Sequence, residues 1–337
     1  MKEQLLKYIA PRLRPAMQGL RSTSFDEMRE IRLRAGRPFN LQIGNDAYYI
    51  TPQGGLTREP GRALLVEAED VGRSLAVITE SSIYALEEEM KRGYITLEGG
   101  HRVGLAGTVR LVQGEPAGFS HISGLAIRVA RQVIGCADDV VNWITGNQGI
   151  PGSTLVIGPP SSGKTTMLRD LCRRFSSGLP GVNVSLIDER SEIAACYGGV
   201  PQLEVGNRTD IIDACPKARG MMMAIRALNP RLVITDEIGS PEDIAAVREC
   251  LNAGVAVLVS VHAASLDEVL RRPGLRELVK EGCFKRGLVL AGQPRPGTVV
   301  SRLTFDRSGR EVTRIAAAGG KPDLNREYGQ FGTDSSR

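Results

Sequence analysis

The stretch VIGPPSSGKTT, residues 156–166, constrains the fold of this chain more than any other part of its sequence. Gly158, Gly163, Lys164 and Thr165 match the spacing G-x4-G-K-[ST]. The apolar run STLVI comes directly before Gly158, and apolar residues at helical spacing follow Lys164. A strand, a glycine-rich loop and a helix are therefore expected in this order, as part of an α/β domain with a parallel sheet.

This loop is suited to hold the phosphates of ATP. Glycines let backbone N–H groups close around phosphate oxygens, and the start of the helix adds its positive dipole. Lys164 can reach the β- and γ-phosphates, and the hydroxyl of Thr165 can bind Mg²⁺. The residues expected to contact the nucleotide are Gly158, Pro159, Pro160, Ser161, Ser162, Gly163, Lys164, Thr165 and Thr166. The competing interpretation is a turn rich in Gly and Ser that matches the spacing by chance.

Two further apolar strands end in pairs of acidic residues. RLVITDEIG contains Asp236 and Glu237, and VSLIDER contains Asp188 and Glu189. Asp236 and Asp188 are candidates to hold Mg²⁺, because an aspartate directly after a buried strand is the expected partner of such a loop. Glu237 and Glu189 are two candidates for the general base, and the sequence does not choose between them. The competing interpretation is a pair of solvated strand ends.

A helix and a strand follow Glu237. SPEDIAAVRECLNAG predicts a helix with Ser240 as N-cap, Pro241 in the first turn and Asp243 closing a capping box. The strand VAVLVSV comes next and leads to His262. We interpret His262 as a sensor of the γ-phosphate, and a core histidine at a strand end is the alternative.

The polar ends of four strands are therefore expected to meet in one crevice. They lie at Gly158, Asp188, Asp236 and His262. Open parallel sheets bind ligands at the carboxyl ends of their strands. This convergence is the main reason to expect a nucleotide site rather than a chance match.

The residues before this domain have a different pattern. Over 24–133, period-two segments such as REIRLR and FNLQIG alternate with two expected helices, at 66–79 and 82–92. A stretch rich in Gly, Asn and Pro at 141–153 then indicates a boundary. We expect an N-terminal α+β domain over residues 1–145, an ATPase domain over 146–315 and a disordered tail over 316–337.

Composition limits the classes of partner. Lys and Arg outnumber Asp and Glu by 43 to 38, but they are dispersed and only 4% of residues are aromatic, so no direct binding of nucleic acid is expected. The six cysteines form no CxxC pair, which favours reduced thiols in a cytosol and no zinc site. No secretory signal and no membrane-spanning stretch are expected, so a partner must supply any attachment to a membrane.

Several segments resemble a known superfamily. EIRLRAGRP, MMMAIRALNPRLVITDEIG and SVHAAS are similar to the N-terminal domain, the arginine-bearing helix with its Walker B strand, and the histidine box of the RecA-like ATPases of type II and type IV secretion and pilus assembly. GGHRVGLAGTV, IDERSEIAA and RTDIIDACPKARGMMMAIRALNP look closer to a sporulation-specific branch of endospore formers. The resemblance runs from about residue 26 to residue 305.

The resemblance implies a RecA-like P-loop NTPase with a parallel-stranded core, preceded by a smaller α+β domain. It also implies a mother-cell cytoplasmic ATPase that forms a homohexameric ring and docks, through a small membrane protein, on a complex linking mother cell and forespore. The chain departs from the secretion motors in having Asp236 where they generally have Gly, and it lacks their tetracysteine module.

Ring assembly gives arginines a role, because a neighbour's guanidinium can stabilise charge at the γ-phosphate. The candidates are Arg102, Arg128, Arg131, Arg208 and Arg226. Arg226 is placed among the catalytic residues because it lies in the segment that resembles the superfamily. For each of the others, a solvated surface charge is the favoured alternative.

Three functions compete at this point. The favoured one is a mechanoenzyme that converts ATP hydrolysis into force on a membrane partner. An ATPase stimulated by nucleic acid is the second, although the aromatic-bearing basic groove that it would need is not evident. A small-molecule kinase or a passive nucleotide switch is the third, and neither an acceptor pocket nor a lid is visible for it.

Overall fold

The computed structural model describes residues 1–79, 90, 93–146, 149, 151–178 and 182–316. The chain divides into two compact units. Unit 1 contains Met1–Val133 and Ser191–Val205, and unit 2 contains Ile134–Arg190 and Gly206–Arg337. The helix predicted at 82–92 and the tail predicted at 316–337 lie almost entirely outside the described residues.

Unit 2 is built on an open sheet whose described strands follow the order β12-β11-β13-β14-β10-β15-β16-β17. The pairings from β12 to β15 are parallel, and β16 and β17 add an antiparallel edge. The strands are β10 Thr154–Gly158, β11 Val184–Asp188, β12 Thr209–Asp213, β13 Leu232–Thr235, β14 Ala256–His262, β15 Arg286–Leu290, β16 Val299–Phe305 and β17 Glu311–Ala316.

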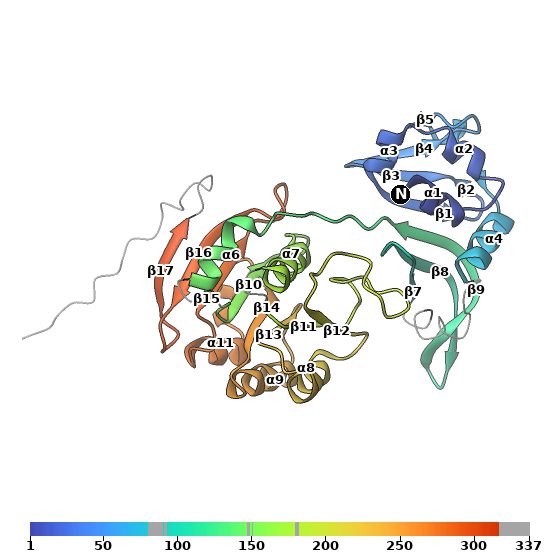
Figure 1. Ribbon diagram of the computed structural model, residues 1–337. Helices are drawn as coiled ribbons and strands as arrows, with labels where there is room; N and C mark the ends of the chain where they lie inside the picture. The colour runs from blue at the N-terminus through green and yellow to red at the C-terminus, as the bar shows by residue number, and fades with distance from the viewer. Residues whose placement is uncertain (80–89, 91–92, 147–148, 150, 179–181, 317–337) are drawn as a thin grey trace, which may run out of the picture. The chain divides into compact units, whose positions relative to one another are not determined.

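Helices cover both faces of this sheet. They are α6 Asp138–Thr145, α7 Lys164–Ser177, α8 Lys217–Ala227, α9 Pro241–Asn252, α10 Leu266–Leu270 and α11 Pro273–Lys280. In Figure 1, α8, α9 and α11 lie together on one face, and α6 and α7 lie on the other. Apolar strands covered on both faces are typical of parallel sheets, which explains why every residue of β10, β11 and β13 is buried.

The predicted capping box at the start of α9 is confirmed. The Ser240 hydroxyl accepts a hydrogen bond from the Asp243 N–H, and the Asp243 carboxylate accepts one from the Ser240 N–H, both at 3.1 Å. Pro241 occupies the first helical position, where its missing N–H costs nothing. The loop before α9 is therefore fixed directly after the acidic pair that ends β13.

Unit 1 contains an antiparallel sheet in the order β5-β4-β3-β1-β9-β8-β7 and a small β2-β6 pair. The strands are β1 Met28–Arg34, β2 Arg37–Pro38, β3 Asn40–Ile43, β4 Asp46–Ile50, β5 Leu56–Thr57, β6 Leu65–Val66, β7 Tyr94–Thr96, β8 Arg102–Val112 and β9 Glu115–Arg128. The helices are α1 Lys2–Lys7, α2 Arg14–Gln18, α3 Ser22–Asp26, the 3-10 turn η1 Pro60–Arg62 and α4 Ala68–Thr79.

The first residues of the chain are part of the core of unit 1. Leu5, Ile9, Leu13 and Met17 are almost completely buried in the same apolar cluster as the strand residue Ile31. Pro11 lies between α1 and α2, and Pro15 lies in the first turn of α2. The apolar residues on both sides of these prolines still pack into the core. The N-terminal segment therefore adds to the domain that the period-two pattern indicated only from residue 24.

The division between the units falls at Val133 and Ile134, whereas the sequence boundary was expected at residue 145. The difference is one helix, α6, which packs on α7 in unit 2. The Ala137 N–H before α6 donates to the buried Asp170 carboxylate at 2.9 Å, and Arg174 pairs with Asp138 at 3.0 Å. The boundary between the units therefore lies before α6 and not after it.

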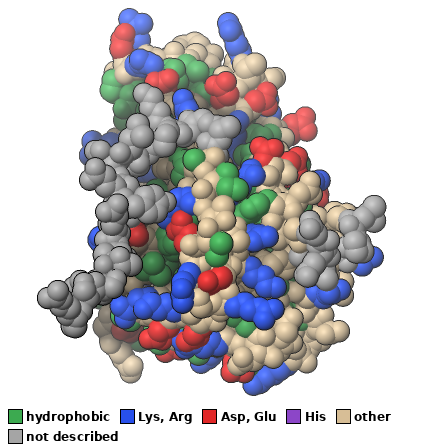
Figure 2. All heavy atoms as spheres, turned by 90° about the vertical axis from the view of Figure 1, so that its left-hand side faces the viewer, with side chains coloured by type: hydrophobic (Ala, Val, Ile, Leu, Met, Phe, Trp, Pro, Cys, Tyr) green, Lys and Arg blue, Asp and Glu red, His purple; other side chains and the backbone are tan. Residues whose placement is uncertain are grey.

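The charged residues are dispersed over the surface in view, as they are in the sequence. Figure 2 shows Lys and Arg side chains interspersed with Asp and Glu over the face in view. All six cysteine thiols are free. Within the residues that the structure describes, no helix has both the length and the apolar character that crossing a bilayer requires.

Unit 1 contains a buried histidine, His101, directly before β8. His101 is 3% exposed, and its Nδ1 accepts a hydrogen bond from the Ala130 N–H at 3.0 Å. An imidazole that accepts at Nδ1 must be neutral, with its proton on Nε2. Burial lowers the pKa of His101 to about 4.

This histidine makes the stability of unit 1 dependent on pH. Because the folded pKa lies below the unfolded value of about 6.5, the unfolded chain binds more protons as the pH falls through this interval. Between pH 7 and pH 5 the free energy of unfolding should fall by roughly 2 kcal/mol from His101 alone. Urea unfolding of His101→Gln should show a smaller fall, while the exposed control His121→Gln should match the wild type; equal slopes in all three proteins would contradict the assignment.

Candidate functional site

Four consecutive strands of the unit 2 sheet bring the predicted site residues to one edge. In the strand order, β11, β13, β14 and β10 are neighbours. Gly158 pairs directly with His262, and Ile187 pairs with Thr235, so Asp188 and Asp236 follow at the same level. Neighbouring strands lie about 4.8 Å apart. The expected convergence of the strand ends is therefore observed.

The loop after β10 requires glycine at both predicted positions. A Cβ on Gly158 would lie 2.3 Å from the Ser162 hydroxyl oxygen. Gly163 has φ +90°, and a Cβ there would lie 2.8 Å from the Gly297 nitrogen. Gly297 also donates its N–H to the Ser162 carbonyl at 2.7 Å. The connection between β15 and β16 therefore packs against this loop and hydrogen-bonds to it.

Two polar groups in this loop are buried. The Ser162 hydroxyl is fully buried, and we find no hydrogen-bond partner for it in the described part of the chain. The Lys164 ammonium, 5% exposed, donates to the carbonyls of Gly158 at 2.9 Å and Pro159 at 3.0 Å. Burial lowers the pKa of Lys164, and the nearby Glu237 carboxylate opposes that change.

Glu237 lies between the lysine and the histidine. Its Oε1 is 3.9 Å from the Lys164 Nζ and 3.2 Å from the His262 Nε2. Its φ of +22° lies in a region that residues other than glycine rarely adopt, at a typical cost of about 1–3 kcal/mol. Ser260 on β14 holds this backbone, because its hydroxyl accepts the Glu237 N–H at 3.0 Å and its carbonyl accepts the Ile238 N–H at 3.0 Å.

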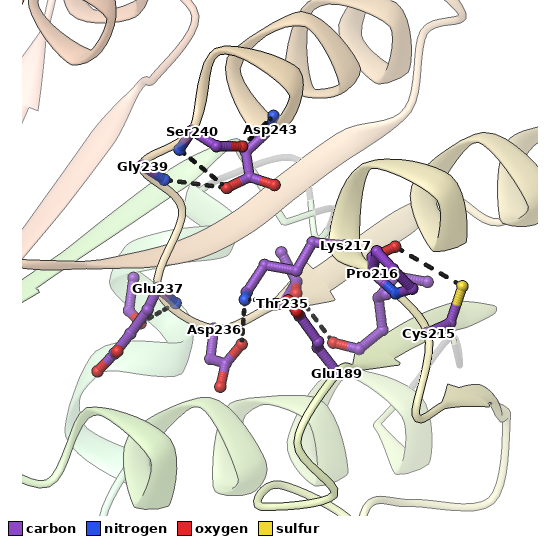
Figure 3. A network of polar contacts seen from close by, with 12 residues as sticks. Glu189, Cys215, Pro216, Lys217, Thr235, Asp236, Glu237, Gly239, Ser240 and Asp243 are labelled. Carbon is purple, nitrogen blue, oxygen red and sulfur yellow. Dashed lines mark hydrogen bonds and ion pairs between the residues drawn. The ribbon is translucent and has the colours of Figure 1, made fainter. Parts of the chain in front are cut away.

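Glu189 and Asp236 both lie next to a lysine, Lys217, that the sequence did not single out. Lys217 begins α8, and Figure 3 shows its side chain extending between the ends of β11 and β13. Its Nζ lies 2.5 Å from the Glu189 Oε2 and 3.5 Å from the Asp236 Oδ1. Burial disfavours the charge, but the Glu189 and Asp236 carboxylates outweigh burial and raise the pKa of Lys217.

Asp188 and Thr165 complete the predicted set. Asp188 ends β11 and is completely buried. Thr165 is the second residue of α7 and is half-buried, next to Lys164. Among the residues that the structure describes, no cluster of three His, Cys, Asp or Glu could hold a metal ion by itself.

Arg226 is not brought to the edge with the acidic residues. It lies in the last turn of α8, nine positions after Lys217, so the two Cα atoms are about 14 Å apart along the helix. Its side chain is exposed. Lys217, at the other end of the same helix, is the cation next to Glu189 and Asp236. That Arg226 acts on the nucleotide of a neighbouring copy stays a prediction.

Two of the other candidate arginines are held by carboxylates of unit 1. Arg102 pairs with Glu192 at 2.8 Å and stacks on the Tyr94 ring, 3.5 Å from its centroid. Arg128 lies 3.8 Å from Glu30. Arg131 and Arg208 are exposed. Their role toward a neighbour's nucleotide stays a prediction.

Three residues that position the site had weak signals in the sequence. Ser260 lies two residues before His262, on a strand that reads as apolar. Gly297 is 133 positions after Lys164 and reaches the loop only through the pairing of β16 with β15. Lys217 had a usable signal, because it begins the first helix after a strand that borders β11.

Two comparisons by sequence match almost the whole chain. The family model described as Sporulation stage III, protein AA matches residues 1–312. Stage III sporulation protein AA of Bacillus subtilis (strain 168) is 40% identical over 315 residues, which cover 92% of this chain and 97% of that protein.

One comparison by structure finds ATPases with a similar fold. The ATPase DotB of Legionella pneumophila is 16% identical with a TM-score of 0.54, over 85% of this chain and 79% of DotB. The pilus retraction motor PilT, solved with bound ADP, is 13% identical with a TM-score of 0.53, over 88% of this chain and 83% of PilT. At these identities the likeness shows the fold alone, and it confirms the predicted RecA-like α/β class.

The cation at the start of α8 should be important for stability. Replacing Lys217 by Met removes the positive charge that pairs with the Glu189 and Asp236 carboxylates. Because Asp236 is buried, this loss should lower the free energy of unfolding by about 2 kcal/mol. Trp143, the single tryptophan of the chain, lies in unit 2 and reports its unfolding in urea.

Arg226→Met is the matched control, since it removes one exposed positive charge from the same helix and should change stability by less than about 0.5 kcal/mol. Adding Asp236→Asn to Lys217→Met should restore part of the loss. Equal unfolding free energies for Lys217→Met and Arg226→Met would show that the buried cation has no structural role.

Proposed function

The chain belongs to the sporulation stage III protein AA family, and on this premise we propose that it hydrolyses ATP with Mg²⁺ to drive a secretion-like membrane complex during sporulation. One observation carries the proposal. A single carboxylate oxygen, Oε1 of Glu237, lies 3.9 Å from the loop lysine and 3.2 Å from His262 at the carboxyl edge of a parallel sheet. Open sheets of this kind bind nucleotides at this edge.

The loop fits the phosphates of ATP. Gly158 and Gly163 leave no room for a side chain, so the backbone can approach a ligand closely. The buried Ser162 hydroxyl and the start of α7 add hydrogen-bond donors. Lys164 donates to two loop carbonyls, and an anionic phosphate would be a stronger acceptor for its ammonium than these neutral groups.

Mg²⁺ fits the residues at the neighbouring strand ends. Thr165 would offer its hydroxyl, and Asp236 and Asp188 are the carboxylates proposed to hold the ion, directly or through water. When bound, Mg²⁺ would neutralise part of the phosphate charge. Lys217 lies 3.5 Å from Asp236 and places a positive charge next to this carboxylate.

Glu237 is the proposed general base, and Glu189 the second candidate. Glu237 is partly exposed and faces Lys164 and His262, whereas Glu189 is held by Lys217. The hydrogen bond from the Glu237 N–H to Ser260 fixes the backbone from which this carboxylate extends. His262, at the same level as Gly158, would sense the γ-phosphate through Glu237.

The assembly that we propose is a homohexameric ring in the mother cell. Arginines of one copy, with Arg226 the first candidate, would then act at the nucleotide of the next copy. A small membrane protein of the same sporulation complex would attach the ring to the membrane. The sporulation context comes from the Bacillus subtilis relative, whose name places it in stage III.

Lys164→Ala tests the site directly. The variant should lose ATP hydrolysis by a factor on the order of a hundred or more, because the lysine balances the charge of the phosphates. Phosphate release by the full-length protein is the measurement, and the fluorescence of Trp143 checks that unit 2 stays folded. Lys280→Ala, which removes an exposed lysine at the end of α11, is the control and should keep wild-type turnover.

Product analysis distinguishes the competing functions. ADP and inorganic phosphate in equal amounts support hydrolysis, whereas ADP with a phosphorylated acceptor would indicate a kinase. ATP hydrolysis by Lys164→Ala at the wild-type rate would show that the assigned site is wrong.

A further inference from the structure

Five arginines on or next to strands β1 and β9 of unit 1 lie close together. They line a shallow groove of about 860 Å³, well within the size of small ligand sites. The groove contains one carboxylate and no lysine. Its charged residues, here called the arginine groove, are Arg29, Arg32, Arg34, Arg128, Arg131 and Glu30.

Strand alternation places these charges together. On β1, Ile31 and Leu33 point into the core, so Glu30, Arg32 and Arg34 share the opposite face. Strand β9 runs beside β1 with Arg128 directly opposite Glu30. The register of these two strands therefore brings Glu30, Arg32, Arg34 and Arg128 together, and Arg29 and Arg131 line the same groove.

Most of the positive charge in the groove is not balanced within unit 1. Glu30 pairs with Arg32 and also lies 3.8 Å from Arg128. Arg29, Arg34 and Arg131 are exposed, and we find no ion pair for them among the described residues. Five guanidinium groups against one carboxylate create a strongly positive surface, which attracts an anionic partner.

The residue types of the groove suit a partner that carries carboxylates. Arginine binds a carboxylate through two parallel hydrogen bonds, which lysine cannot do. No aromatic side chain lines the groove, although stacking on aromatic rings supplies much of the affinity for single-stranded nucleic acid.

The rest of the lining suits a polypeptide. Asn40 and Gln42 lie opposite Arg32 and Glu30 on β3, and their amides can pair with a peptide backbone. Val129 and Val133 add apolar contacts. Alternate residues along β1 lie about 6.8 Å apart, which matches the spacing of alternate side chains in an extended peptide.

We propose that the arginine groove binds an acidic, extended segment of a partner protein. The proposal does not depend on ATP hydrolysis, since the groove lies within unit 1 and the binding is measured without nucleotide. Arg128 and Arg131 would then serve this partner rather than a neighbour's nucleotide.

Fluorescence anisotropy of a labelled peptide with glutamate at alternate positions tests the proposal on the full-length protein. Arg29→Gln/Arg32→Gln/Arg34→Gln should weaken binding at least about tenfold, and salt should weaken it in the wild type. The matched control, Arg58→Gln/Arg62→Gln/Arg73→Gln, removes the same charge from exposed arginines of unit 1 outside the groove. It should change the affinity less than about twofold.

Several outcomes would overturn the proposal. They are no binding of the peptide, equal weakening in the two triple variants, and displacement of the peptide by oligothymidylate or by phosphatidylglycerol vesicles that bind more tightly at the same arginines. Displacement by oligothymidylate would assign the groove to nucleic acid, and displacement by the vesicles would assign it to a membrane. Normal ATP hydrolysis in the groove variants, together with lost peptide binding, would separate this surface from the nucleotide site.

Discussion

The parallel register of β11, β13, β14 and β10 is the constraint on which the site in unit 2 depends. Each strand carries its polar residue at its carboxyl end, and pairing such as Gly158 with His262 sets these ends level. A shift of one residue would turn every side chain of a strand to the other face of the sheet. Every residue of β10, β11 and β13 is buried, so a shift along the strand direction would also carry a polar strand end into the packed sheet. The core of unit 2 thus determines the geometry of its edge.

The edge concentrates charges that a protein interior does not normally accept. Lys164, Lys217, Asp188 and Asp236 are all less than 9% exposed. A buried charge is stable only when it is paired or well hydrogen-bonded. Lys217 is held by two carboxylates, and Lys164 by two backbone carbonyls and, at longer range, by Glu237. The weaker partners of Lys164 make it the cation best able to exchange them for a ligand.

The sequence predicted the parts of the site that depend on local pattern. The spacing of Gly158, Gly163 and Lys164, the acidic pairs after apolar strands and the capping box at Ser240 are all signals of a few neighbouring residues. The RecA-like fold class followed from them together with the resemblance. The observed strand order then placed these signals at one edge, as expected.

Other features depend on contacts between distant residues, and the sequence did not reveal them. The link from Gly297 to the loop at Ser162, the Lys217 bridge and the return of residues 191–205 to unit 1 all require the folded chain. The arginine groove is a further example. The basic residues look dispersed in the sequence, but the pairing of β1 with β9 brings arginines about 100 positions apart onto one surface.

The central claim is that the loop after β10 holds the triphosphate through its backbone and Lys164. A crystal structure of the full-length protein with Mg²⁺ and a non-hydrolysable ATP analogue is the most direct test. The account predicts the phosphates against the N–H groups of residues 161–165, with the Lys164 ammonium moved from the Gly158 and Pro159 carbonyls to a phosphate oxygen. A nucleotide bound elsewhere, or a lysine that stays on these carbonyls with the analogue present, would contradict it.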